Sequence, residues 1–116
     1  MAILEMTFAL SAPARRAMKS IASARNLEFI AERFFDKIEH ERYRDFAVNP
    51  GYYTTPHGHR QAKSYRPTGE KLQSLRTSLT IKTFRGMKKL QARGLNLTWQ
   101  LEEILYFGFQ QGFIDI

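Results

Sequence analysis

Cysteine is absent from the 116 residues of this sequence, which excludes disulfide bonds, thiol nucleophiles and thiolate metal sites. No stretch approaches the roughly 18 consecutive apolar residues of a membrane-spanning helix. The opening residues, MAILEMTFAL, also lack the leading positive charge of a secretory signal. We therefore expect a soluble, cytoplasmic protein with no membrane partner, built as one domain over residues 1–116.

Signatures of catalysis are lacking as well. The sequence has no glycine-rich phosphate loop and no nucleophile elbow. Glu102 and Glu103 are adjacent, so on a helix their carboxylates point about 100° apart and do not share one substrate. His57 and His59 flank a glycine in a loop, and a third metal ligand would have to be His40 or a carboxylate. We expect a non-catalytic protein without a metal or another cofactor.

Acidic residues are scarce in the central block 60–93, which holds ten cations and a single acid, Glu70. The segments 1–59 and 94–116 carry net charges of +1 and −3, so the block's +9 accounts for the total of +7. Like charges repel within a compact fold unless an anion lies against them, which favours nucleic acid as the partner, DNA ahead of RNA. The predicted nucleic-acid contacts are Arg60, Lys63, Arg66, Arg76, Thr80, Lys82, Arg85, Lys88, Lys89 and Arg93.

Proline is rare outside residues 49–67, which contain three of the four prolines and read NPGYYTTPHGHRQAKSYRP. This stretch has neither helical nor strand periodicity, and a loop of such length is usually functional or mobile. Its aromatic residues alternate with cations, an arrangement on which unpaired bases stack. Tyr52, Tyr53 and Tyr65 are the candidates for stacking; packing of these tyrosines over the core is the alternative.

Hydrophobic periodicity predicts a mainly α fold, with four to five helices and one or two short strands in a single compact domain. Alternation in residues 3–10 indicates a half-buried strand. Its inward residues are Met6, Phe8 and Leu10, and its outward residues are Glu5, Thr7 and Ala9. Ser11 is predicted to cap the next helix, and Asn26 to cap a second helix that ends near Phe46. These elements make up residues 3–46.

The rest of the chain is predicted to be helical, although residues 77–84 have a β-prone composition that leaves one helix end open. Thr68 is expected to cap a helix, and Gly94 to end the following one in a left-handed conformation. The last helix is expected to begin at Leu97 with Thr98 as its cap and to end at Gly112. The apolar face of the first of these helices is predicted to consist of Leu72, Leu75 and Leu79.

The segment 68–112 thus joins a basic helical part to an apolar C-terminal helix. Twelve of the last 22 residues are large and apolar, more than a surface helix needs. A homodimer or a larger protein assembly would bury them, with Trp99, Phe107 and Phe109 at the interface. Packing within the core is the alternative.

The order strand, helix, short turn, helix occurs at residues 3–46 and again at 79–112. The first copy reads ILEMTFAL, SAPARRAMKSIASA, RN and LEFIAERFFDKI; the second reads SLTIKTF, RGMKKLQARG, LN and LTWQLEEILYFGF. This order resembles the ribbon-helix-helix family of DNA-binding proteins. The resemblance implies a dimer in which one strand from each chain forms a two-stranded ribbon that enters the major groove. It also implies that the N-terminus of the second helix holds a phosphate.

In the second copy, the resemblance implies that Thr80 and Lys82 face the bases. The flanking cations Arg85, Lys88 and Lys89 would meet the DNA backbone. In the first copy, an outward Glu5 would be repelled by phosphate but can accept a hydrogen bond from cytosine.

A DNA-binding regulator, or an accessory subunit of a nucleoprotein complex, is the function that the sequence favours. Two other functions stay open. One is a small interaction or inhibitor protein whose basic face binds an acidic protein groove. The other is a helical subunit of a larger assembly that docks through its apolar C-terminus.

Overall fold

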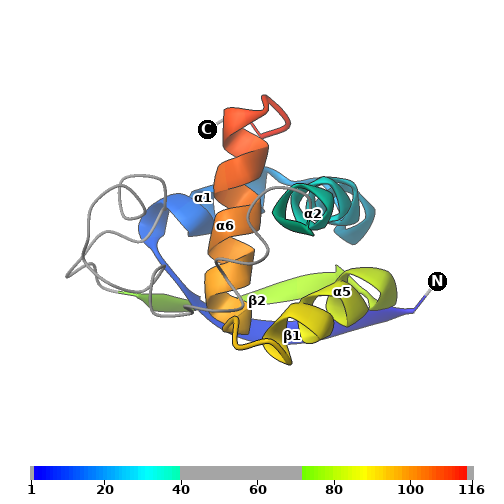
Figure 1. Ribbon diagram of the computed structural model, residues 1–116. Coiled ribbons are helices and arrows are strands. Elements are labelled where there is room, and N and C mark those ends of the chain that lie inside the picture. Colours follow the sequence, from blue (N-terminus) through cyan, green and yellow to red (C-terminus); the bar gives the residue numbers. More distant parts are fainter. Residues whose placement is uncertain (1, 40–71, 115–116) are drawn as a thin grey trace, which may run out of the picture.

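Two strand–helix–helix units make up this computed structural model, which describes residues 2–39 and 72–114 (Figure 1). The first unit contains β1 (Ile3–Leu10), α1 (Ala12–Ser20) and α2 (Ala24–Lys37); the second contains β2 (Gln73–Thr80), α5 (Ile81–Gln91) and α6 (Leu97–Gln110). Within these ranges the four helices and two strands confirm the predicted mainly α fold. None of the described helices combines the length and apolar character needed to cross a membrane.

The two strands pair with each other in an antiparallel sheet, so that one chain supplies both strands that the family resemblance assigned to two chains. Ile3 lies opposite Thr80 and Leu10 opposite Gln73. The alternation predicted for β1 is confirmed, because Phe8 and Leu10 are buried and Met6 is half-buried, whereas the outward residues Glu5, Thr7 and Ala9 are exposed. In Figure 1 the sheet lies along the lower side of the molecule, and α1, α2 and α6 stand above it. One face of the sheet therefore remains open to solvent.

The second strand corrects the prediction for this part of the chain. The helical face expected to contain Leu75 and Leu79 is instead the inward face of β2, which alternates with exposed polar residues. The β-prone residues 81–84 belong to helix α5, which begins directly after the strand. The spacing of the leucines fits both periods, and pairing with β1 decides in favour of the strand because it satisfies the backbone hydrogen bonds of both segments.

The helix ends follow the predictions only in part. Ser11 caps α1 as expected, since its Oγ accepts a hydrogen bond from the backbone N–H of Ala14 at 3.4 Å. Ser23, rather than Asn26, caps α2, and Asn96, rather than Thr98, caps α6. In both corrected cases the cap lies two or three residues earlier than expected, at a side chain that accepts from the backbone N–H of the third residue after it. The predicted helix end near Phe46 lies outside the described residues.

Glycines end the second helix pair as predicted. Gly94 has φ 101° and Gly112 has φ 82°, both in the left-handed region. After α5 the Gly94 N–H donates to Gln91 O and the Leu95 N–H to Leu90 O, which is the Schellman arrangement. The same two bonds follow α6, because the Gly112 N–H donates to Phe109 O and the Phe113 N–H to Gly108 O.

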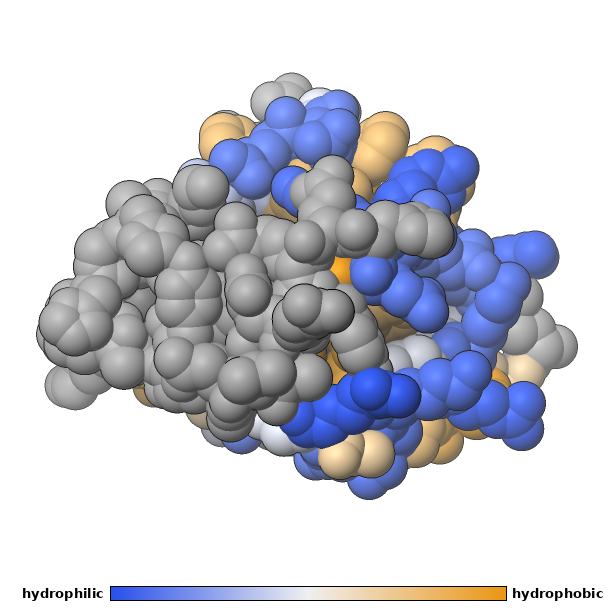
Figure 2. Space-filling model, viewed as in Figure 1, coloured by the Kyte–Doolittle hydropathy of each residue, from blue (hydrophilic) through white to orange (hydrophobic). Residues whose placement is uncertain are grey.

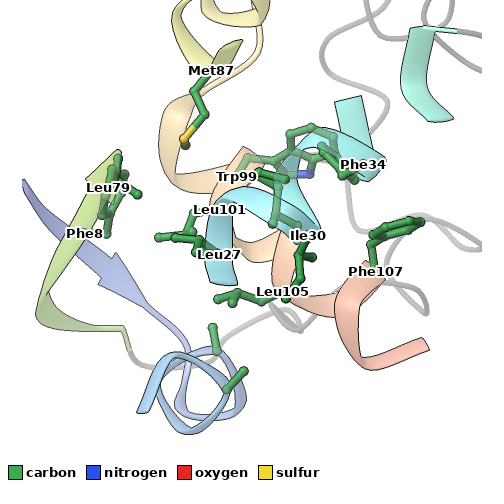
Figure 3. Packing of buried hydrophobic residues seen from close by; sticks show 14 of the residues in the cluster. Phe8, Leu27, Ile30, Phe34, Leu79, Met87, Trp99, Leu101, Leu105 and Phe107 are labelled. Atoms are coloured by element: carbon green, nitrogen blue, oxygen red, sulfur yellow. The ribbon is translucent and has the colours of Figure 1, made fainter. Parts of the chain in front are cut away.

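Helix α6 lies at the centre of the hydrophobic core. Leu101, Ile104 and Leu105 are fully buried, and Figure 3 shows side chains of α2 and α6 meeting at the centre of the cluster. Trp99 is 6% exposed and Phe107 9%, so both side chains pack in the core of this chain, which was the alternative expectation for them. Phe109 is exposed. Hydrophilic residues cover most of the coloured surface in Figure 2.

Candidate nucleic-acid interface

The outer face of the sheet, which we call the ribbon face, is a row of small or charged side chains open to solvent. It consists of Glu5, Thr7 and Ala9 from β1 and Ser74, Arg76 and Ser78 from β2. Directly opposite each other lie Glu5 and Ser78, Thr7 and Arg76, and Ala9 and Ser74. The three β1 residues and the exposure of Arg76 agree with the sequence prediction. The two serines were missed because a helix was expected there, although the alternation in QSLRTSLT signals them.

Arg76 and Glu5 form an ion pair across the ribbon face. Arg76 Nε lies 2.6 Å from Glu5 Oε1, and the two side chains are 75% and 50% exposed. Solvent screens such a pair, so it adds little to the stability of the fold. Its effect is on orientation, because it holds one edge of the guanidinium and leaves the terminal nitrogens Nη1 and Nη2 as further donors.

A hollow opens where the turn between α1 and α2 meets β2. Its lining includes Lys19, the cap residue Ser23, and both Arg76 and Ser78 of the ribbon face. The N-terminus of α2 brings unpaired backbone N–H groups to this hollow, and two cations stand beside them. The hollow therefore brings two cations, Lys19 and the Glu5-paired Arg76, to the N-terminus of a helix.

A second groove, between α2 and α5, has mixed charge. Three of the predicted phosphate contacts line it: Lys82, Arg85 and Lys89. Its opposite wall carries Glu32, Asp36 and Glu39. A phosphate entering this groove would meet carboxylates as well as cations, so these three cations do not form a free basic surface. Lys88 lies outside the groove; its Nζ donates to Gln91 Oε1 at 2.7 Å.

Lys82 is already paired at one end of that groove, where its Nζ lies 2.5 Å from Glu32 Oε1. The hydrogen bond to Glu32, and then the charge of Glu32, raise the pKa of Lys82 above its ordinary value of 10.5. The lysine is accordingly charged throughout the neutral range, with a protein carboxylate as its counter-ion.

Thr80 corrects the expectation that it faces a base. It caps α5, with its Oγ1 accepting from the Thr83 N–H at 3.2 Å, and only 1% of the residue is exposed. The hydroxyl donates to Glu28 Oε1 at 2.5 Å. Lys82 is exposed, but on a helix rather than on the predicted strand. Both differences follow from the end of β2 at Thr80, where the chain turns directly into α5.

The corresponding strand–helix corner of the first unit, at Ser11, is also held by hydrogen bonds to a glutamate. Glu102 of α6 is fully buried and accepts two hydrogen bonds from Ser11, from the backbone N–H and from Oγ, each 2.9 Å long. Each strand–helix corner is thus held by a glutamate from the second helix of the other unit: Glu102 at Ser11 and Glu28 at Thr80. The two corners fix the strands at the ends where the ribbon face begins.

Six predicted site residues lie outside the described ranges: Arg60, Lys63, Arg66, Tyr52, Tyr53 and Tyr65; the histidines considered as metal ligands, His57 and His59, lie outside them too. In the ranges 2–39 and 72–114, no three histidine or carboxylate side chains come together as metal ligands would. Compared with protein-family models, with curated proteins and with solved structures, the chain matches none of them.

Proposed function

We propose that this protein is a non-catalytic DNA-binding protein that inserts its ribbon face into the major groove, as a regulator or an accessory subunit of a nucleoprotein complex. The observation that carries the proposal is an exposed antiparallel pair of strands with donors and acceptors on its outer side and helices on the other. The major groove, about 12 Å wide, admits a two-stranded ribbon and displays a distinct pattern for each base pair. The resemblance to ribbon-helix-helix proteins supports the same mode of binding.

Charge supports a polyanionic partner. The chain carries a net charge of +7, and binding to DNA gains free energy from the counterions that each lysine or arginine displaces. Lys19 lines the hollow at the start of α2, where the helix dipole also favours a phosphate. We assign the DNA backbone to this edge, and the bases to the centre of the ribbon face.

Fluorescence anisotropy of the full chain tests the proposal with labelled duplex DNA, single-stranded DNA and RNA of equal length, each at several salt concentrations. We expect duplex DNA to bind most tightly, with an affinity that falls steeply as salt rises. Absence of binding to duplex DNA at about 50 mM salt would refute the proposal. A preference for single strands would assign the function to a stacking surface instead of the ribbon face.

Two arginine variants locate the interface. Arg76→Ala and Arg85→Ala remove the same charge from exposed side chains, but Arg76 lies on the ribbon face and Arg85 in the mixed-charge groove. We expect Arg76→Ala to weaken duplex binding by about 10- to 100-fold, the range for a base-contacting arginine. Arg85→Ala is expected to change binding by less than about threefold. Equal effects of the two variants would show that charge alone, and not the ribbon face, holds the DNA.

A further inference from the structure

We infer that a single chain recognises an asymmetric DNA site, and that Arg76 reads one guanine near the centre of that site. The inference rests on the proposed function and deepens it by naming the kind of sequence that the ribbon face fits. It follows from the pairing of the two strands and from the residues at equivalent positions of the two units.

The first step is the equivalence of the strands. Both strands run into a cap residue, Ser11 in the first unit and Thr80 in the second. When the sequences of the two units are aligned on these cap residues, Thr7 corresponds to Arg76. Thr7 and Arg76 are also direct partners across the sheet, so they flank the approximate twofold axis of the ribbon. Two identical strands would place one residue type there twice, whereas this ribbon has a threonine and an arginine.

The second step is the difference between the two ends of the ribbon face. On one side of the centre Glu5 lies opposite Ser78, and on the other Ala9 lies opposite Ser74. One end therefore presents a carboxylate and a hydroxyl, and the other a methyl group and a hydroxyl. A palindromic duplex presents the same base edges to both ends, and this ribbon face complements such a duplex at one end only. One chain supplies both strands, so the ribbon is complete, and asymmetric, without a second chain.

The third step is the chemistry of the Arg76–Glu5 pair. The pair leaves the Arg76 terminal nitrogens to donate together to O6 and N7 of guanine, a contact that only the fork of an arginine makes in this form. Glu5 holds the fork through Nε at 2.6 Å, and a carboxylate accepts from the N4 amine of cytosine. The pair thus fits a guanine with a cytosine beside it, on the same or the opposite strand.

Selection from randomised duplexes by the full chain tests this inference, combined with native mass spectrometry of the complex with the selected duplex. We expect a non-palindromic motif that contains a G·C pair near its centre, bound by one chain. Arg76→Lys keeps the charge and removes the fork, so the preference for the central guanine should fall about tenfold or more while the salt dependence stays the same. Arg85→Lys, the matched control in the α2–α5 groove, should leave the preference unchanged.

A palindromic motif bound by two chains would overturn the inference. Salt-dependent binding without any sequence preference, or an Arg76→Lys variant that keeps the full guanine preference, would also overturn it, and both results would leave the proposed binding to DNA standing. Failure to bind any duplex would refute the proposed function itself. The outcomes of the experiment therefore separate the two claims.

Discussion

Glu102 occupies an environment that a carboxylate does not prefer. Its side chain lies fully buried in α6, the most apolar of the four described helices. Removing a carboxylate from water is costly, and hydrogen bonds to the charged group offset part of that cost. Here the two bonds come from Ser11, which lies 91 residues earlier in the chain. The hydrogen bonds from Ser11 therefore offset part of the cost of burying Glu102, and they fix the position of the corner between β1 and α1.

Replacing Glu102 tests this role. Glu102→Ala leaves the Ser11 N–H and Oγ without their buried acceptors, and we expect the free energy of unfolding to fall by about 2–4 kcal/mol. Glu102→Gln keeps one acceptor oxygen and should cost about half as much. Urea unfolding followed by circular dichroism measures both values. The control is Glu39→Ala, an exposed glutamate just after the end of α2, with an expected change within about 0.5 kcal/mol; a Glu102→Ala value that small would contradict the role.

At the scale of elements, α2 and α5 approach each other at Gly86. A Cβ atom added to Gly86 would lie 2.5 Å from Phe35 Cε2 and 2.9 Å from Cδ2, closer than real side chains pack. Glycine is normally unfavourable within a helix, by about 1 kcal/mol relative to alanine. The close contact with the Phe35 ring explains why glycine fits this position in α5.

We expect Gly86→Ala to lower the free energy of unfolding by about 1 kcal/mol, because displacement of the Phe35 ring outweighs the gain in helix propensity. In a Phe35→Leu background the same change should become neutral or stabilising, as a double-mutant cycle by urea unfolding would show. Gly112→Ala is the matched control: no atom lies within 4 Å of the added Cβ, but φ is +82°, so its cost should persist in both backgrounds. An equal cost of Gly86→Ala in both backgrounds would refute the contact with Phe35.

The sequence predicts those elements whose signals are local. The β1 alternation and the caps at Ser11, Gly94 and Gly112 each depend on residues within a few positions, and the structure has them as predicted. For β2, the local signals conflict, because a leucine at every third or fourth position is typical of a helix. The alternation in QSLRTSLT indicates a strand over the same residues, and the pairing with β1, more than 60 residues away, decides between the two.

The same distinction applies to the candidate site. Glu5, Thr7 and Ala9 could be placed on the outer face because β1 was predicted as a strand. Arg76 was singled out by charge alone, and its ion pair with Glu5 depends on the register of two distant strands. The acidic wall of the α2–α5 groove could not be foreseen from charge counts, since it depends on which helix lies beside which.

At the scale of the whole molecule, both units share one core. Leu27 and Ile30 of α2 lie among side chains of α6, and Phe34 packs against Phe107 with ring centroids 6.0 Å apart (Figure 3). Neither unit can bury its apolar residues without the other. We therefore infer that the two units unfold together.

The variant Leu27→Ala tests this cooperativity. Removal of a fully buried leucine from the first unit should lower the free energy of unfolding by about 2–5 kcal/mol. Fluorescence of Trp99, the single tryptophan, reports on the second unit, and far-ultraviolet circular dichroism reports on all helices. We expect their urea midpoints to shift together to the same lower value. A Trp99 midpoint that stays at its original value would show that the second unit is stable alone.

The exchange of glutamates between the corners has a consequence for how the chain could be divided. Each half contributes one strand to the ladder, one cap residue that needs a carboxylate, and one carboxylate that the other half needs. The halves therefore behave as two complementary subunits that happen to share a backbone. Residues 2–39 and 72–114, produced as separate peptides, should each be unstructured in isolation and should form a one-to-one heterodimer on mixing. Because each peptide should fold only in the complex, the appearance of folded structure would report directly that the two peptides have associated.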